Sequence, residues 1–236
     1  MSSETTRLQM SLLQPAQAQK HVTVNEALMR LDGMVNLVLE SVSTVTPPAA
    51  AIDGQCWGVP AQAQGDWSGH AGKIAVGSNG GWIFVMPVRG MQGFVLDRAS
   101  RAIHDGDVWV VGALGLGTTG SAMIAGMAEG EVDLASGSTI ISDVFIPGGA
   151  MVIGAAARVV TPLSGTLSSW RLGTSGATNR FGQGLGKDTG SWARGMLGSP
   201  MTYYQPEPLI ISAENGEFTG GRIKLAVHWW EMRLPV

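Results

Sequence analysis

The chain has 236 residues, of which 44% are hydrophobic and 14% are charged, so it can bury a core as one large domain or two small ones. The formal net charge of −3 argues against nucleic acid or an anionic membrane as the main partner. Cys56 is the single cysteine, which excludes an intramolecular disulfide and a thiolate metal cluster.

The glycine and proline content predicts the fold class. The 34 glycines and 11 prolines are spread between short apolar stretches, without the strict period of collagen. Such a pattern is typical of many short strands joined by tight turns. We therefore expect a mainly β protein: a short N-terminal helix plus a small antiparallel β module, followed by a jelly-roll-like C-terminal β-sandwich.

The chain is expected to divide into four segments. They are an extended attachment arm (1–22), a helix with a Trp-rich antiparallel module (23–112), a Gly-rich connector (113–137) and the β-sandwich (138–236). The polar start does not resemble a secretory signal, and no apolar run reaches the roughly 18 residues that a membrane span needs. We expect synthesis in the cytoplasm without a signal peptide, and no membrane partner.

One helix is predicted directly after the arm. Thr23 and Glu26 fit a capping box, in which both side chains satisfy free backbone donors at a helix start. Apolar residues then follow at alternating spacings of four and three: Val24, Leu28, Leu31, Val35, Val38 and Val42. This a/d pattern indicates a short helical seam, with the helix packing both on its own β module and on other copies of the chain. The alternative is an amphipathic helix that packs only on its own sheet.

Tryptophans and turn dipeptides mark the β module. Four tryptophans each follow a turn glycine, at Trp57, Trp67, Trp82 and Trp109. Asn79-Gly80 and Asp105-Gly106 are hairpin-turn dipeptides, and we expect a type I′ turn at each. The tryptophans have two interpretations: a carbohydrate-binding surface or the core of the module.

The connector is expected to carry a weak helical patch around Ala122 to Ala128, and strand signals return from Ser138. In the last strand two faces alternate: Ile223, Leu225, Val227 and Trp229 on one, and Lys224, Ala226, His228 and Trp230 on the other. Asn215-Gly216 predicts a hairpin turn just before this strand.

The stretch "LLQPAQAQKHVTVNEALMRLD", Leu12 to Asp32, resembles the opening of a domain family of unknown function found in prophages and gene transfer agents of alphaproteobacteria. The similarity continues to about Trp109. The C-terminal half looks like the β-sandwich tips of phage tail fibres and head spikes, through "RFGQGLG", "GSWARG" and "SPMTYYQPEPLIISAENGEFTGGRIKLAVHWWE". The resemblance brings no functional residues that can be placed position by position.

The resemblance implies a fibre or spike protein assembled on an extracellular phage-like particle. Such a protein would bind other particle proteins through its N-terminal arm and host capsular or lipopolysaccharide sugars through its tip. Fibres of this kind are homo-oligomers, so a trimer is favoured and a pentamer remains open.

The glycine-rich stretch "NRFGQGLGKDTGSWARG" has the composition of a phosphate-binding loop but not its spacing. Counted back from Lys187, the first glycine of a P-loop would fall on Phe181, and Asp188 stands where Ser or Thr should bind magnesium. Nucleotide binding is therefore excluded at this loop.

Aromatic and planar polar residues around this loop indicate carbohydrate binding. Sugars stack their C–H faces on Trp or Tyr, while Arg, Asn and Asp read the hydroxyls. The candidate residues are Trp170, Asn179, Arg180, Asp188, Trp192, Arg194, Tyr203 and Tyr204. The alternative is that Trp192 and Tyr203 belong to the core or a subunit interface and that the glycines only turn corners.

Catalysis finds little support in the sequence. The four histidines are scattered without metal-ligand spacing, and no Gly-x-Ser-x-Gly elbow occurs. We expect no metal, no cofactor and no enzyme activity. The leading hypothesis is a receptor-binding fibre or spike. The alternatives are a polysaccharide depolymerase or deacetylase on the same scaffold, with carboxylates such as Glu207 and Glu214, and a spacer that binds another particle protein.

Overall fold

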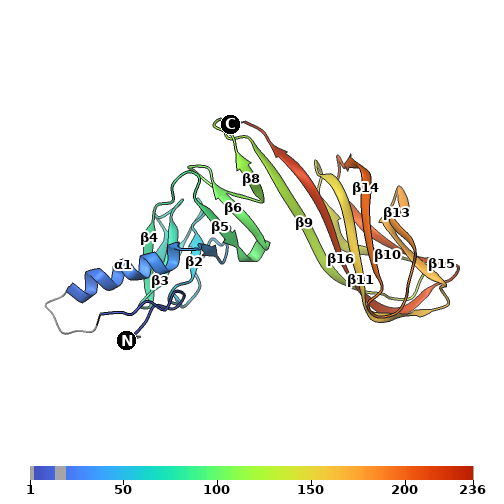
Figure 1. Cartoon of the computed structure of the whole chain (residues 1–236), viewed down its shortest axis with the longest axis horizontal. Helices are drawn as coiled ribbons and strands as arrows, with labels where there is room; N and C mark the ends of the chain where they lie inside the picture. The colour runs from blue at the N-terminus through green and yellow to red at the C-terminus, as the bar shows by residue number, and fades with distance from the viewer. Residues whose placement is uncertain (1–2, 14–19, 236) are drawn as a thin grey trace. The chain divides into compact units, whose positions relative to one another are not determined.

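The computed structural model describes residues 3–13 and 20–235, with Lys20 and His21 as backbone only. The described chain is mainly β, as predicted, with the α-helix α1 (Lys20–Met34) near its start (Figure 1). The chain divides into two compact units. Unit 1 contains Met1–Ala122 with Leu234–Val236, and unit 2 contains Met123–Arg233.

Unit 1 contains a seven-stranded sheet in the order β4-β3-β2-β1-β5-β6-β7. Its strands are β1 (Val38–Leu39), β2 (Cys56–Gly58), β3 (Ile74–Ser78), β4 (Gly81–Val85), β5 (Gln92–Val95), β6 (Ser100–His104) and β7 (Trp109–Val111). The short elements η1 (Gly65–Trp67), η2 (Leu96–Arg98) and β8 (Ala113–Leu116) complete it. The module is antiparallel, as predicted, except that the two-residue strand β1 runs parallel to both β2 and β5.

The helix differs from the prediction at both ends. It begins at Lys20, so Thr23 lies inside it and no capping box forms. It ends at Met34, and Asn36 follows with a φ of 48°, the left-handed conformation that commonly closes a helix.

The predicted continuous helical seam is therefore wrong. Val24, Leu28 and Leu31 lie on α1. Val35 follows the helix, Val38 belongs to β1, and Val42 packs against the core of the sheet. The chain leaves the helix at Asn36 and pairs in the sheet instead.

One face of α1 packs on the sheet of unit 1. Met29 is buried, and Gly33 allows a close approach, because a Cβ at this position would lie 2.8 Å from Cγ1 of Val76. Val24 and Leu31 keep 41% and 48% of their surface exposed. The helix thus covers its own sheet, as both interpretations expect, and also leaves exposed apolar side chains.

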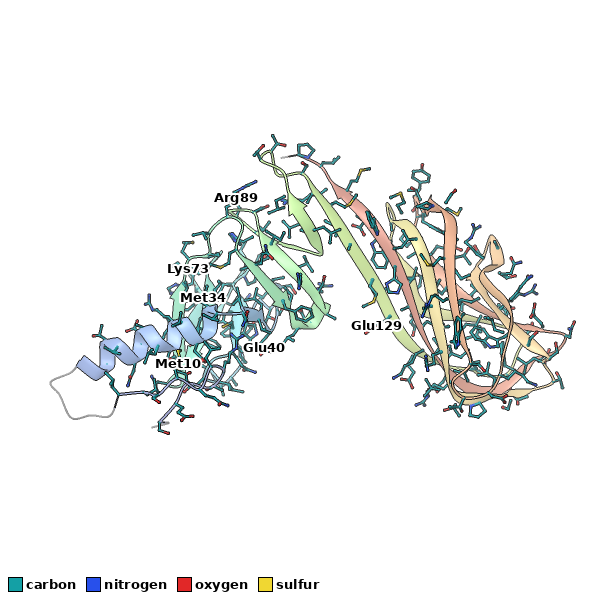
Figure 2. All side chains as sticks on the ribbon, viewed as in Figure 1. Met10, Met34, Glu40, Lys73, Arg89 and Glu129 are labelled. Atoms are coloured by element: carbon teal, nitrogen blue, oxygen red, sulfur yellow. The ribbon has the colours of Figure 1, made fainter. Side chains whose placement is uncertain are left out.

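The segment of residues 3–13 folds back onto the end of α1, so the prediction of an extended arm is wrong for this part. Asp32, with no exposed surface, accepts hydrogen bonds from Thr5 Oγ1 (2.7 Å) and from the backbone N–H groups of Arg7 (3.0 Å) and Leu8 (2.6 Å). Met10, labelled in Figure 2, lies on the same segment and donates its N–H to Thr5 Oγ1. The remainder of the predicted arm at 1–2 and 14–19 lies outside the described residues.

The guanidinium of Arg7 caps the C-terminal end of α1. It donates to the carbonyl oxygens of Asp32 (3.2 Å), Gly33 (2.8 Å) and Asn36 (2.6 Å). The first two are carbonyls of the kind that a helix end leaves without partners, and a cation there also interacts favourably with the helix dipole. Residues 3–13 and the helix therefore form one structural element.

The two predicted hairpin turns of unit 1 differ in conformation. Asn79 and Gly80 have φ values of 51° and 74°, which confirms the type I′ turn between β3 and β4. At Asp105-Gly106 the type I′ prediction is wrong, because only the glycine has a positive φ. Asp105 Oδ1 instead accepts the backbone N–H of Asp107 (2.9 Å) and of Val108 (2.8 Å), which closes the turn.

Three tryptophans of unit 1 form a cluster. The ring centroids of Trp57, Trp67 and Trp82 lie 5.2–5.9 Å apart, and two of the three pairs meet edge to face. Trp57 and Trp67 are buried together with Val59 and Ala75. The core interpretation is therefore confirmed for these two tryptophans.

Unit 2 is a jelly roll. Its eight strands are β9 (Ala122–Asp133), β10 (Thr139–Ile146), β11 (Met151–Gly165), β12 (Ser169–Thr174), β13 (Ala177–Leu185), β14 (Trp192–Thr202), β15 (Glu207–Glu214) and β16 (Phe218–Arg233). In this unit β9 pairs with β16, β10 with β15, β11 with β14 and β12 with β13, so the pairs are nested from the outermost strands inward. Among the strands of unit 2 the sheet orders are β10-β15-β12-β13 and β14-β11-β16-β9, and the jelly-roll prediction is confirmed.

The strand β9 corrects the prediction of a helical patch around Ala122 to Ala128. Its side chains alternate in burial as in a half-buried strand. Gly126 contributes to its packing, because a Cβ there would lie 2.4 Å from the ring of Trp229 on β16. The small alanine and glycine side chains of β9 obscure its apolar–polar alternation in the sequence. The large side chain that packs on Gly126, Trp229, comes from the last strand of the unit.

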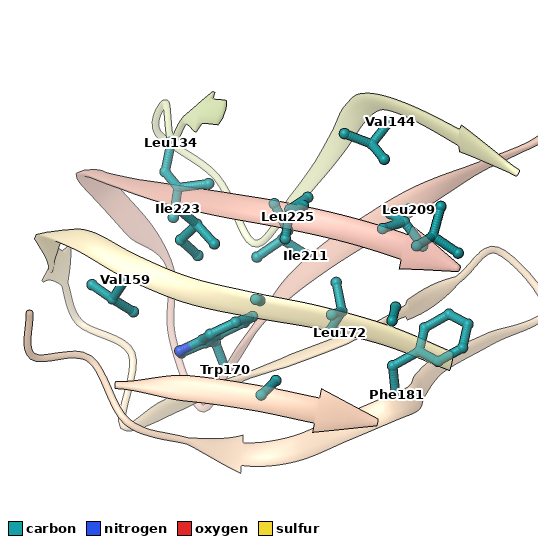
Figure 3. Packing of buried hydrophobic residues seen from close by; sticks show 14 of the residues in the cluster. Leu134, Val144, Val159, Trp170, Leu172, Phe181, Leu209, Ile211, Ile223 and Leu225 are labelled. Carbon is teal, nitrogen blue, oxygen red and sulfur yellow. The ribbon is translucent and has the colours of Figure 1, made fainter. Parts of the chain in front are cut away.

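The core of unit 2 lies between its two sheets. Figure 3 shows Trp170, Leu172 and Leu209 from one sheet meeting Val159, Ile223 and Leu225 from the other in a single apolar layer. The predicted alternation of the last strand is confirmed, since Ile223, Leu225, Val227 and Trp229 are all buried. The opposite face of β16 points away from the core and forms part of the outer surface of its sheet.

Candidate functional site

The outer face of the β14-β11-β16-β9 sheet carries the candidate site. Since side chains alternate along a strand, the residues next to the buried Ala193, Ala157 and Leu225 point away from the core. This outer face bears Trp192 and Arg194 on β14, Ala156 and Arg158 on β11, Lys224 and Ala226 on β16, and Glu129 on β9. We name these seven residues the outer platform.

Strand register arranges the platform in two rows. Trp192 lies opposite Arg158, which lies opposite Lys224 on the next strand. In the neighbouring row, Arg194 lies opposite Ala156, which lies opposite Ala226. Directly opposed side chains have Cβ atoms about 4.5–5.5 Å apart, so each row forms one continuous contact surface.

The platform is hollowed at its centre. The two alanines form a low floor, and the long side chains of the platform enclose a hollow of about 480 Å³ above it. Glu129, labelled in Figure 2, lines it from β9. The volume falls within the roughly 300–1,000 Å³ typical of small-molecule sites.

Trp192 is the exposed aromatic side chain of the platform. It keeps 60% of its surface exposed, and the Arg194 Cζ lies 5.7 Å from its ring centroid. A guanidinium at this distance is attracted to the ring face and holds the indole in position. The arrangement presents a flat apolar surface beside fixed hydrogen-bond donors.

Charges next to the platform are partly neutralised within the sheet. Glu131 Oε1 lies 3.2 Å from Arg222 NH1, and its Oε2 lies 3.8 Å from Lys224 Nζ. Arg222 also donates to Asp133 (2.5 Å), and this bond raises the pKa of the guanidinium above its usual range. Arg158 and Glu129 have no hydrogen bond or ion pair from their side chains within the described part of the chain.

The eight predicted carbohydrate residues do not form one site. Trp192 and Arg194 lie on the platform. Trp170 is a correction: it has no exposed surface and its Nε1 donates to the Gly186 carbonyl (2.7 Å) inside the core. Tyr203 packs partly buried against the same core, with its hydroxyl enclosed.

The other four predicted residues lie away from the hollow. Asn179 and Arg180 are on β13, where they bond Gln183 (2.9 Å) and the Met201 sulfur (2.9 Å). Asp188 is exposed in the connection between β13 and β14, and Tyr204 is exposed after β14.

The glycine-rich stretch, residues 179–195, runs from β13 in one sheet through a connection to the start of β14 in the other, without a helix to receive a phosphate. Lys187 Nζ donates to the Leu167 carbonyl (2.9 Å). Glu214 Oε2 accepts from Ser169 Oγ (2.6 Å) and from the Gly184 N–H (2.9 Å), and these bonds lower the pKa of its carboxyl group. The polar groups of this loop therefore stabilise the sandwich.

Sequence reasoning missed Arg158, Lys224, Ala156 and Glu129 as site residues. The alternation of the last strand had already placed Lys224 and Ala226 on one face. The register that brings this face beside Trp192 depends on pairing between distant strands, which no local pattern shows.

Two further findings concern the chemistry of the chain. Across residues 3–13 and 20–235, no group of three or more His, Cys, Asp or Glu side chains is arranged to hold a metal ion. No helix in the described ranges is long and apolar enough to cross a membrane.

Comparison with known proteins finds a family match for part of the chain and matches among solved structures. A chain described as "Cyanophage Pam1 capsid asymmetric unit" is 18% identical, with a TM-score of 0.35 over 45% of this chain and 84% of that chain. No curated protein matches. Residues 24–110, which lie in unit 1, match a family described as "Protein of unknown function (DUF2793)".

Proposed function

We propose that this chain is a non-enzymatic component of a phage-like particle and that its jelly roll binds polysaccharide on the host cell surface. The observation that carries the proposal is the outer platform. An exposed Trp192, held by Arg194, stands beside a hollow of about 480 Å³ with a floor of alanines.

The chemistry of the platform fits a sugar chain. An indole face offers apolar area to the C–H face of a sugar ring, and guanidinium groups offer fixed donors to its hydroxyl and carboxylate oxygens. The alanine floor lets a chain of rings lie across the strands. Jelly rolls occur in lectin and viral capsid domains, which supports the proposal by analogy of fold alone.

The particle part of the proposal rests on the resemblance of Leu12–Asp32 to prophage and gene transfer agent proteins. The exposed Val24 and Leu31 on α1, together with Val35 directly after it, offer an apolar surface to other copies of the chain, and a trimer is favoured. Light-scattering mass tests this point, and a monomer of 24.6 kDa at micromolar concentration contradicts it.

The binding experiment uses the full chain with purified host capsular polysaccharide and lipopolysaccharide. Trp192→Ala removes the exposed indole and is expected to weaken binding at least tenfold, which is about 1.4 kcal/mol. Tyr204→Ala is the matched control, because it removes an exposed aromatic of the same unit outside the hollow. Equal loss in both variants contradicts a site on the platform.

The same samples separate the alternative functions. Shortening of the polysaccharide or release of acetate during incubation supports a depolymerase or deacetylase. Equal retention of the protein by capsulated and acapsular cells removes the receptor proposal and favours a spacer that binds another particle protein.

A further inference from the structure

The platform has a charge of opposite sign to the chain. The chain carries a formal net charge of −3, yet the hollow is lined by Arg158, Arg194 and Lys224 against the single carboxylate of Glu129. The nearby Glu131 is already paired with Arg222 and approached by Lys224. A ligand in the hollow therefore meets an excess of positive charge.

Arg158 is the cation of the platform that is least engaged within the protein. Arg194 lies against the Trp192 ring, and Lys224 Nζ lies 3.8 Å from Glu131. Arg158 is exposed and has no such partner within residues 3–13 and 20–235. Its guanidinium fork is therefore free to bind a planar anion through two parallel hydrogen bonds.

The position of Arg158 defines what the fork can reach. By register it stands directly opposite Trp192 on one side and Lys224 on the other. A sugar ring stacked on the indole would therefore place its substituents beside the guanidinium, at the cross-strand distance of about 5 Å. The second cation adds attraction for the same negative group.

We propose that the platform selects acidic polysaccharides, with a uronic-acid ring stacked on Trp192 and its carboxylate bound by Arg158. This inference rests on the proposed function and narrows its ligand to chains that carry a carboxylate on the sugar. Lys224 strengthens the attraction, and Ala156 and Ala226 leave room for the ring.

Nucleic acid fits the same surface less well. Binding a phosphate backbone relies on cations that follow the chain of charges. Here three cations share one hollow, and the carboxylate of Glu129 on β9 lines the same hollow, where it repels a continuous polyanion. A uronic-acid ring instead offers an apolar C–H face to Trp192 and a planar carboxylate to the guanidinium of Arg158.

The test compares two polymers that differ only at the carboxylate. Polygalacturonate and its methyl ester have the same sugar rings, and their binding to the full chain is measured by titration calorimetry at low salt. We expect the wild type to bind polygalacturonate at least tenfold more tightly than the ester. Arg158→Gln should reduce this preference to less than threefold, and Trp192→Ala should weaken binding of both polymers.

Two further variants separate charge from geometry. Arg158→Lys keeps the charge without the fork, so we expect it to retain only part of the preference. Arg101→Gln removes the same charge from β6 of unit 1 and should leave the preference unchanged. Thermal unfolding of Arg158→Gln should match the wild type, because the side chain is exposed.

Each remaining outcome has a defined meaning. Equal binding of polygalacturonate and its ester, or a preference that Arg158→Gln leaves intact, overturns the inference while the proposed function stands. Failure of polygalacturonate to bind also overturns it, and the proposed function then survives only if the host polysaccharides bind. Tighter binding of single-stranded DNA than of polygalacturonate overturns the inference in favour of nucleic acid.

Discussion

Tryptophans are buried in both units, but unit 2 also carries Trp192 on its surface. In unit 1, Trp57 and Trp67 lie inside a cluster with Trp82 and hold the module together. In unit 2, Trp170 fills the core of the sandwich, whereas Trp192 stands on the outer face with 60% of its surface exposed. The face of the strand or turn on which a tryptophan falls, and not the glycine beside it, decides whether it is buried in a core or exposed on a surface.

Cys56 provides a way to measure unit 1 by itself. Its thiol is buried in the core of that unit, and burial raises its pKa to about 12. The thiolate is the reactive form, so a thiol reagent should label Cys56 only after unit 1 opens. The rate and denaturant dependence of labelling then report the stability of this unit in each variant below.

The largest expected effect tests the difference between buried and exposed tryptophans. Trp67→Ala should lower the free energy of unfolding of unit 1 by about 3–5 kcal/mol, because it removes a fully buried indole from the cluster. Trp192→Ala should change the stability of unit 2 by less than about 0.5 kcal/mol, as surface substitutions do. Denaturant unfolding followed by circular dichroism and Cys56 labelling measures both. Similar losses in the two variants contradict the assignment of Trp192 to a binding surface.

A smaller effect is expected at Asp32, which joins residues 3–13 to α1. Asp32→Ala should destabilise unit 1 by about 3 kcal/mol, since each donor left without a partner at a buried site costs about 1–3 kcal/mol. Limited trypsin digestion should also become faster at Arg7. The control is Asp97→Ala, which removes an exposed carboxylate from η2. Unchanged digestion at Arg7 in the Asp32 variant contradicts the role given to this contact.

The smallest effect concerns pH and again involves unit 1. His104 is buried beside Trp109, and desolvation lowers its pKa from 6.5, although Asp105 and Asp107 oppose the shift. The unfolded chain then binds the proton more readily than the folded one, so stability is complete above about pH 6.5 and falls as the pH drops below this value. His104→Phe should flatten the pH dependence of the free energy of unfolding between pH 5 and 7. Tryptophan fluorescence is used to follow unfolding here in place of Cys56 labelling. An unchanged pH slope contradicts a neutral buried histidine.

The parts of the fold that could be predicted are those set by local sequence, such as the alternation of side chains along a strand or a turn dipeptide. The two faces of β16 follow directly from alternation, and Asn79-Gly80 adopts its expected turn because both residues tolerate a positive φ. The helical seam failed at Asn36, where one residue in the left-handed conformation ends the helix. The strand β9 was missed because alanine and glycine contrast little with their neighbours.

The candidate site was predictable only in part, for a physical reason. Trp192 and Arg194 lie two residues apart on one strand, so their association is local. Arg158 and Lys224 join them through pairing of β11 with β14 and β16, which depends on the global topology. Trp170 was predicted as a site residue on the same grounds as Trp192, namely an aromatic residue near Arg, Asn and Asp, but its side chain points into the core.

A crystal structure of the full chain with a bound acidic oligosaccharide, such as a trigalacturonate, tests the central claim most directly. Our account predicts one sugar ring over the Trp192 indole, a carboxylate within hydrogen-bond distance of Arg158, and the chain lying above Ala156 and Ala226. A sugar bound instead at Asp188 or Tyr204, with the hollow of the platform left unfilled at saturating ligand, would contradict it.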